Sequence, residues 1–297
     1  MKILLPIDGS KYSEGAAKFL TFLNLYPNDE ITVFHALHCS HFPYNEKSYQ
    51  AIKELKKLLV PGILDSALNI LKPVKAKIST VIVEGPAKQT IVEKTAEAGM
   101  DLIVMGARGI KGIESLLLGS VTRAVAIKST VPVLATKLPL SVKPGGMKIL
   151  FATDGSDYSI STQEFLSSMP FPDNSEIMVL NVTPPILSDI PLTVVPEIRE
   201  RFIEIVETAR ESERMKSGRI IDRARDYLSR RFEHVNVLSV EGDASSEILA
   251  VSETLKADLI AVGCRGLTGI KGMMGSVSRN VLSHSRCSVL IGKMCGD

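Results

Sequence analysis

The sequence predicts an α/β fold of two tandem domains, each with a parallel sheet that helices cover on both faces. Two observations lead to this prediction: short apolar, β-branched runs alternate with longer helical segments, and the whole pattern occurs twice. Strands that are apolar along their length are typical of parallel sheets buried on both faces, and intervening helices are their usual crossover connections.

The internal repeat is visible at the start of each half. The stretch "MKILLPIDGSKYSEGAAKFL" from Met1 aligns without a gap with "MKILFATDGSDYSISTQEFL" from Met147, and residues 83–109 align in the same way with residues 240–266. Because the period is about half the chain, the unit is a whole domain rather than a short solenoid repeat. We therefore expect domains at 1–137 and 147–297, joined by a linker at 138–146 that contains Pro and Gly.

Each half is predicted to contain five strands. The predicted strands span residues 2–7, 30–37, 77–84, 101–106 and 131–136 in the first half, and 148–153, 176–182, 235–241, 258–263 and 288–293 in the second. Helical periodicity is clear at 13–23 and 87–98. The charged segment 197–232 spaces its apolar residues at helical intervals, which predicts a helix with one solvated face.

Composition limits the classes of partner and compartment. The chain has 297 residues, 45% of them hydrophobic and 23% charged, which is typical of a soluble globular protein. A net charge of +2, 5% aromatic residues and no Trp give no argument for nucleic acid or an anionic membrane as partner. With no apolar run near the roughly 20 residues that span a bilayer, and no C-x-x-C pair among the four Cys, we expect a cytoplasmic protein.

A glycine-rich loop follows the fourth predicted strand. Gly106 and Gly109 are followed by nine residues and then by Gly119 and Ser120, where helical character begins. Free N–H groups that lead into a helix N-terminus attract phosphate, and ligands of open parallel sheets bind at the carboxyl edge. Asp8, which ends the first strand at that edge, is suited to ribose hydroxyls or a divalent cation. Together these groups suit a nucleotide.

The pattern G-x2-G-x9-G-[ST], with an Asp closing the first strand, resembles the universal stress protein family over nearly the whole chain. The resemblance implies a Rossmann-like domain in each half. It also implies that ATP, ADP or AMP binds with its phosphates on the glycine loop, its ribose and any Mg²⁺ near the Asp, and its adenine near the end of the second strand. The candidate binding residues of the first half are Pro6, Ile7, Asp8, Ala36, Gly106, Arg108, Gly109, Gly119, Ser120, Val121 and Thr122.

The second copy departs from this pattern. Only eight residues separate Gly266 from Gly275, and Ala152 stands where the first copy has Pro6. The shorter loop is expected to redirect several N–H groups and weaken the second site, although additional glycines can absorb the change. The candidate residues of this site are Ala152, Thr153, Asp154, Val182, Gly263, Arg265, Gly266, Gly275, Ser276 and Val277.

Simpler interpretations exist for the same residues. The glycines could serve tight turns, Asp8 and Asp154 could be helix N-caps, and Arg108 and Arg265 could be solvated rather than clamp a phosphate. The segment "HALHCSH" gathers His35, His38, Cys39 and His41. No metal site is expected there, because the spacing is not that of a zinc site and the second half has no equivalent ligands.

The predicted function is that of an adenine-nucleotide-binding module or switch in the response to stress. The alternatives are a slow metal-dependent ATP hydrolase, with Asp8 holding the metal, and a nucleotide-free interaction scaffold. The chain has no Walker loop, no G-x-G-x-x-G fingerprint and no evident Ser-His-Asp triad, so efficient turnover is not expected. The family resemblance also implies an internal pseudo-dimer through the last strands "VPVLAT" and "SVLIGK". Assembly of two such chains into a homodimer is a further hypothesis, which a monomeric mass in light scattering would exclude.

Overall fold

The computed structural model describes residues 1–38, 46–109, 118–140, 145–186, 199–267 and 273–294. The strands of the first half are β1 (Lys2–Pro6), β2 (Glu30–Leu37), β3 (Lys77–Glu84), β4 (Leu102–Gly106) and β5 (Val133–Thr136), and those of the second are β6 (Lys148–Ala152), β7 (Glu176–Thr183), β8 (His234–Glu241), β9 (Leu259–Gly263) and β10 (Ser288–Gly292). The helices are α1 (Lys11–Leu20), α2 (Glu46–Leu71), α3 (Ala87–Glu97), α4 (Ser120–Lys128), α5 (Asp157–Ser168), α6 (Arg199–Leu228), α7 (Ala244–Leu255) and α8 (Ser276–His284).

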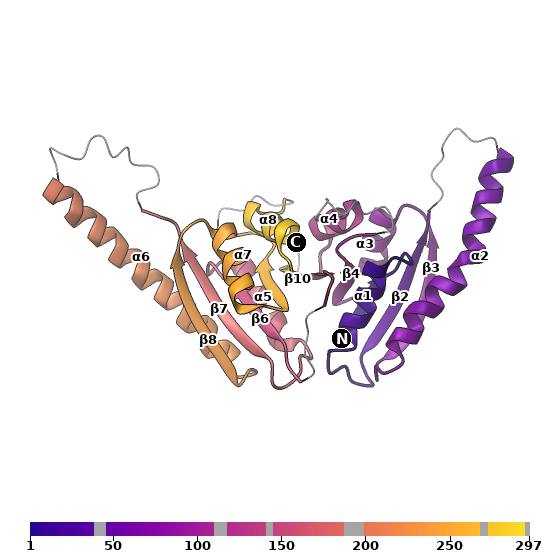
Figure 1. Cartoon of the computed structure of the whole chain (residues 1–297), viewed down its shortest axis with the longest axis horizontal. Helices are drawn as coiled ribbons and strands as arrows, with labels where there is room; N and C mark the ends of the chain where they lie inside the picture. Colours follow the sequence, from indigo (N-terminus) through magenta and orange to yellow (C-terminus); the bar gives the residue numbers. More distant parts are fainter. Residues whose placement is uncertain (39–45, 110–117, 141–144, 187–198, 268–272, 295–297) are drawn as a thin grey trace.

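These strands form a single sheet with the order β3-β2-β1-β4-β5-β10-β9-β6-β7-β8. The strand pairs within each half are parallel, and β5 pairs with β10 in the antiparallel direction. The predicted α/β fold, with a five-stranded parallel sheet and covering helices in each half, is therefore confirmed. Figure 1 shows the two halves on either side of the β5–β10 junction.

Alternate residues of each strand supply the two faces of the sheet. In β1, Ile3 and Leu5 are fully buried in a cluster that includes Phe19 of α1 and Leu71 of α2. The opposite face carries Leu4, which is buried together with residues of α3 and α4. This arrangement explains why central strands such as β1 and β4 are continuous apolar runs, since both of their faces lie against helices.

The junction between the halves is part of the hydrophobic core. Leu134 of β5 lies opposite Leu290 of β10, and both are fully buried in the same cluster as Ile3 and Ile149. The predicted pairing of the last strands is thus present within one chain. The two halves form a continuous core because the antiparallel pair joins their sheets edge to edge.

Two long helices lie at the outer ends of the molecule. Figure 1 shows α2 beside β3 and α6 beside β8, each extending past the top of the sheet. The helix predicted within 197–232 is α6, and its exposed face carries charged side chains. None of the described helices is long and apolar enough to cross a membrane.

Candidate functional site

A turn that contains an Asp follows the first strand of each half. The backbone N–H of Ser10 donates to Asp8 Oδ1 over 3.0 Å, and that of Ser156 donates to Asp154 Oδ1 over the same distance. The side chains of Ser10 and Ser156 cap α1 and α5. The interpretation of the two Asp residues as helix N-caps is therefore wrong, because the Ser two positions later caps each helix and the Asp stabilises the preceding turn.

Each of these Asp residues also contacts the beginning of the glycine loop. A Cβ atom added to Gly109 would lie 2.5 Å from Asp8 Oδ2, and one added to Gly266 would lie 2.6 Å from Asp154 Oδ2. In the second half, the N–H of Leu267 donates to Asp154 Oδ2 over 3.1 Å. Neither Gly109 nor Gly266 has a positive φ angle. The loop therefore needs glycine here for close approach to a carboxylate rather than for a turn with positive φ.

The second half contains a pocket at the carboxyl ends of β6, β7 and β9. Its volume is about 530 Å³, which is within the range of about 300–1,000 Å³ that is usual for small-ligand pockets. The structure brings together all the residues that the sequence nominated in this half. The pocket is lined by Ala152, Thr153, Asp154, Val182, Gly263, Arg265, Gly266, Gly275, Ser276 and Val277, among others. The loop that is one residue shorter is thus compatible with a pocket.

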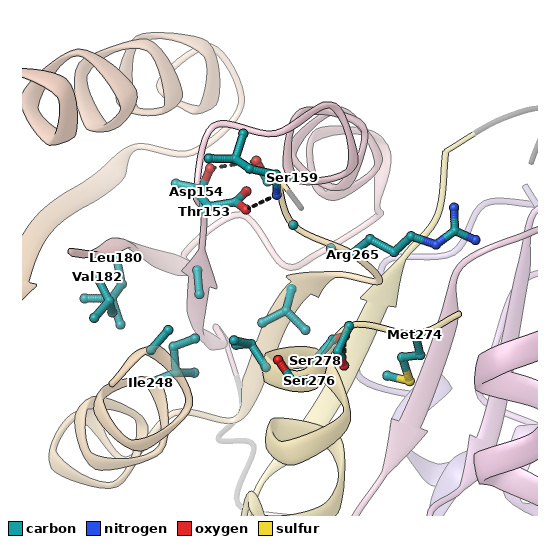
Figure 2. A pocket seen from close by; sticks show the side chains of 18 of the residues that line it. Thr153, Asp154, Ser159, Leu180, Val182, Ile248, Arg265, Met274, Ser276 and Ser278 are labelled. Atoms are coloured by element: carbon teal, nitrogen blue, oxygen red, sulfur yellow. Dashed lines mark hydrogen bonds between the residues drawn. The ribbon is translucent and has the colours of Figure 1, made fainter. Parts of the chain in front are cut away.

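Polar and apolar groups line different sides of this pocket. Figure 2 shows Asp154 on one side, Leu180, Val182 and Ile248 on another, and Ser276 at the beginning of α8. Leu180 and Ile248 are buried, whereas Ser276 is exposed. A flat apolar group fits against the hydrophobic side, while polar substituents can reach Asp154 and the helix N-terminus.

The N-terminus of α8 is available to an anion. Gly275 occupies the N-cap position and no side-chain hydrogen bond caps the helix. The N–H of Gly275 donates to Cys264 O over 2.8 Å, and the buried Ser278 hydroxyl donates to the same carbonyl over 2.9 Å. These two bonds hold the end of the loop onto the end of β9. The first turn of α8 then presents its N–H groups and the positive end of the helix dipole to the pocket.

In the first half, equivalent hydrogen bonds hold the N-terminus of α4 to the end of β4. Gly119 is the N-cap of α4, its N–H donates to Ala107 O over 2.7 Å, and no side chain caps the helix. The Thr122 hydroxyl is buried and donates to Gly106 O over 2.8 Å, so Thr122 holds the helix against the strand end. Pro6, Ile7 and Ala36 end the neighbouring strands, and Ser120 and Val121 begin α4. Residues 110–117 of this loop lie outside the described residues.

The two loop arginines bind within the protein. The Arg265 guanidinium lies over the Tyr158 ring at 4.9 Å from its centroid, and its Nε donates to Met273 O over 2.8 Å. Arg108 lies over the Tyr12 ring at 5.5 Å and donates to the Tyr12 hydroxyl over 3.1 Å. Figure 2 shows Arg265 pointing away from Asp154 and Ser276. Both arginines are therefore stacked on a helix tyrosine, an arrangement that differs from both sequence-based interpretations.

Several residues of the pocket were missed by the sequence analysis. These are Ser159, Leu180, Ala244, Ile248, Val262, Leu267, Met273, Met274 and Ser278. Ala244 begins α7, which Asp243 caps by accepting from the Ser246 N–H over 2.9 Å, a bond that also lowers the pKa of Asp243. The helix start was recognisable in "VEGDASSE". The position of this helix beside β6 and β7 was not recognisable, because it depends on the strand order.

The described residues do not form a protein metal cage. No group of three or more His, Cys, Asp or Glu side chains comes together among them. His35 is buried and its Nδ1 lies 2.9 Å from Ile7 O, while Cys39 and His41 lie outside the described residues. Asp154 is the carboxylate among the described lining residues of the pocket. A single carboxylate suits Mg²⁺ that arrives with nucleotide phosphates better than it suits a free cation.

Comparisons with known proteins identify the family of this chain. The model of the Universal stress protein family matches residues 1–137 and 147–293. The chain belongs to the universal stress protein family. The universal stress protein MJ0531 of Methanocaldococcus jannaschii is 34% identical over 140 residues, which cover 46% of this chain and 82% of that protein. This relative therefore matches about half of the tandem chain.

One solved universal stress protein structure shows the same fold over nearly the whole chain. This structure, from Archaeoglobus fulgidus, covers 98% of this chain and 96% of its own, with 22% identity and a TM-score of 0.64. Another, a universal stress protein in complex with cAMP, is 22% identical, covers 45% of this chain and 94% of its own, and has a TM-score of 0.34.

Proposed function

We propose that this universal stress protein binds adenine nucleotides, ATP, ADP or AMP, and acts as a binding module or switch in the response to stress. The observation that carries the proposal is the pocket of the second half, where an uncapped helix N-terminus, a glycine loop and a carboxylate surround a space with an apolar side. Phosphate requires the helix N-terminus and the glycine loop, ribose requires the carboxylate, and a flat base requires the apolar side.

The proposed roles follow from position in the pocket. The N–H groups of Ser276 and Val277 lie at the beginning of α8, where they can bind phosphate. Asp154 Oδ1 accepts from both the N–H and the hydroxyl of Ser156, and Oδ2 accepts from the Leu267 N–H, so the remaining lone pair of Oδ2 can accept from a ribose hydroxyl. The apolar side formed by Leu180 and Ile248 is suited to adenine.

The first half is proposed to bind in the same way, through Asp8 and the loop from Gly106 to Ser120. The support is the repeated contact of an Asp with the loop glycine and the repeated uncapped helix N-terminus. The proposal includes the division into domains at 1–137 and 147–297 with a linker at 138–146. Arg108 and Arg265 are proposed to hold the loops through their tyrosine partners rather than to clamp phosphate directly.

Nucleotide binding without efficient turnover is the expected activity. Mg²⁺ would be held between Asp154 and the phosphates, where it would neutralise phosphate charge. The pocket lining contributes no second carboxylate and no His among the described residues. A general base for water is therefore not evident, and any ATP hydrolysis should be far slower than the usual enzymatic rate of about 1 per second or more.

Isothermal titration calorimetry of nucleotide-stripped protein tests the proposal. The full chain is titrated with ATP and Mg²⁺ and separately with AMP, and two sites per chain are expected. Gly109→Val and Gly266→Val assign the sites, because each new side chain would displace the carboxylate that contacts the glycine. Each variant should lose one site. Gly218→Ala is the matched control, since a Cβ at Gly218 meets nothing within 4 Å.

The opposite result is also informative. If neither nucleotide produces heat or raises the unfolding temperature, the glycine loops are structural and the protein is a nucleotide-free scaffold. If heat is observed but both valine variants retain two sites, the nucleotide binds elsewhere in the chain.

A further inference from the structure

A lysine of the first half contacts the last helix of the second half. Lys137 follows β5, and its Nζ donates to Ser285 O over 2.6 Å and to Ser283 O over 3.5 Å. Only 9% of Lys137 is exposed. The two carbonyls belong to the C-terminal turn of α8, where helix carbonyls have no intrahelical partner. Lys137 therefore caps a helix that belongs to the other half.

The same contact occurs in the reverse direction. Lys293 follows β10 as Lys137 follows β5, and its Nζ donates to Ile127 O of α4 over 3.4 Å. In the alignment of the two halves, "VLATK" matches "VLIGK", so the two lysines are equivalent. Figure 1 shows α4 and α8 on either side of the junction between the halves. The cross-domain contact is thus present in both directions.

Both helices held in this way begin at a glycine loop. The N-terminus of α8 lines the pocket of the second half, and α4 starts at the equivalent loop of the first. Each has nine residues, about 13 Å of helix, so a contact at one end fixes the position of the other. A cation at the C-terminus also complements the helix dipole whose positive end faces the bound anion.

We propose that Lys137 and Lys293 are positioning residues for the nucleotide sites, each fixing the phosphate-binding helix of the opposite domain. The inference rests on the proposed function, because it assigns the N-termini of α4 and α8 to phosphate. Its consequence is that each site is complete only when both domains are joined. A site in one half then responds to changes at the junction with the other half.

Lys137 is buried and still carries a positive charge. The pKa of Lys137 is lowered to about 8, mainly by burial; Cys287 opposes this shift and the Arg108 guanidinium contributes to it. Burial raises the pKa of the Cys287 thiol to about 12, so the thiol is neutral at pH 7. Arg108 and Cys287 are the charged and titratable groups that act on Lys137 among the described residues. The cap therefore keeps its charge at pH 7 despite the cost of burial.

Binding to the second site alone gives the first test. In the Gly109→Val background, which leaves the site at α8, Lys137→Met should weaken ATP binding roughly fivefold, since a helix-terminus charge has effects of this order. Lys137→Arg, which keeps the charge and the donors, should restore affinity to within about twofold of Lys137. Lys293→Met is the matched control and should leave this site unchanged. Equal ATP affinities of the Gly109→Val protein with and without Lys137→Met would overturn the inference while leaving nucleotide binding intact.

Hydrogen exchange of the nucleotide-free full chain gives a second test that does not depend on the ligand. Lys137→Met should reduce the protection of α8 amides at least threefold and leave α4 unchanged, whereas Lys293→Met should do the reverse. Unchanged α8 protection in Lys137→Met would overturn the inference. If wild-type protein binds no nucleotide but the reciprocal loss of protection is observed, the cross-domain positioning stands and the proposed ligand is wrong.

Discussion

His35 and Asn181 occupy the same position in the two halves and contact equivalent backbone carbonyl oxygens. The Asn181 amide donates to Thr153 O over 2.7 Å, and His35 Nδ1 lies 2.9 Å from Ile7 O. Because a carbonyl oxygen can only accept, the His35 ring must carry a proton on Nδ1. Both carbonyls immediately precede the Asp of the proposed site. The equivalence indicates that His35 serves as a buried hydrogen-bond donor to the backbone.

The equivalence predicts that His35→Asn is tolerated. The Asn amide can replace the imidazole donor, as it does in the second half, so the free energy of unfolding should change by less than about 1 kcal/mol. His35→Leu leaves the Ile7 carbonyl without this donor and should cost about 1–3 kcal/mol. Urea unfolding of the two variants compares them directly. A similar loss in both would mean that the ring is required for packing rather than for its N–H.

Asp154 is predicted to be necessary for the second site. Asp154→Ala removes the acceptor for the Leu267 and Ser156 N–H groups, and bonds to charged groups contribute about 1.5–3 kcal/mol each. ATP affinity at this site, measured by calorimetry in the Gly109→Val background, should fall at least tenfold. Asp173→Ala is the control, because Asp173 is exposed in the segment before β7, at the opposite edge of the sheet. Unchanged affinity in Asp154→Ala would move the nucleotide away from this Asp.

Two helical glycines should respond oppositely to Ala. Gly218 of α6 has open space around it, so Gly218→Ala should stabilise the protein by about 0.5–1 kcal/mol through helix propensity. Gly15 of α1 is buried, and a Cβ there would lie 2.8 Å from Leu138 Cδ2. Gly15→Ala should therefore destabilise by about 1–3 kcal/mol through overpacking. Thermal unfolding of both variants measures the contrast, and a shift of the same sign in both would contradict the packing described for Gly15.

Because the pKa of Lys137 is lowered in the folded protein, the free energy of unfolding is expected to depend on pH. The pKa of Lys137 is about 8 in the folded protein and 10.5 for an ordinary lysine, so between these values the unfolded chain binds one more proton than the folded chain. The free energy of unfolding must then rise with pH in this window, by up to about 3 kcal/mol, and stay level below it. Urea unfolding from pH 7 to 10.5 should show this rise in wild type relative to Lys137→Met. Parallel curves would mean that the lysine is not buried.

Much of the fold was predictable because its signals are local. The strands are continuous apolar runs, the repeat is readable by eye, and the glycines and Asp8 stand at strand ends. In a parallel sheet strand ends share an edge, so Asp8 and Gly106 could be placed together without knowing the distances. The segment 197–232 was predicted to contain a helix and contains α6.

The apolar side of the pocket was not predictable in the same way. Leu180 and Ile248 are apolar residues of the core cluster, and an apolar residue that faces a pocket has the same sequence pattern as one that faces the core. Arg265 could not be distinguished from a solvated residue, because its partner Tyr158 lies on a helix 107 residues earlier in the chain. Such partners follow from strand order and helix placement, which no local pattern encodes.

The sequence by itself determined two copies of one α/β unit and the edge at which each copy collects glycine, Asp and a helix start, because strand and helix periodicity are properties of neighbouring residues. The tertiary structure decided what those residues contact. It placed Asp154 against Gly266 and it carried Lys137 across the junction to Ser285. These contacts join residues far apart in the chain, and only the packing of helices on a sheet, with β5 paired to β10, brings them within reach.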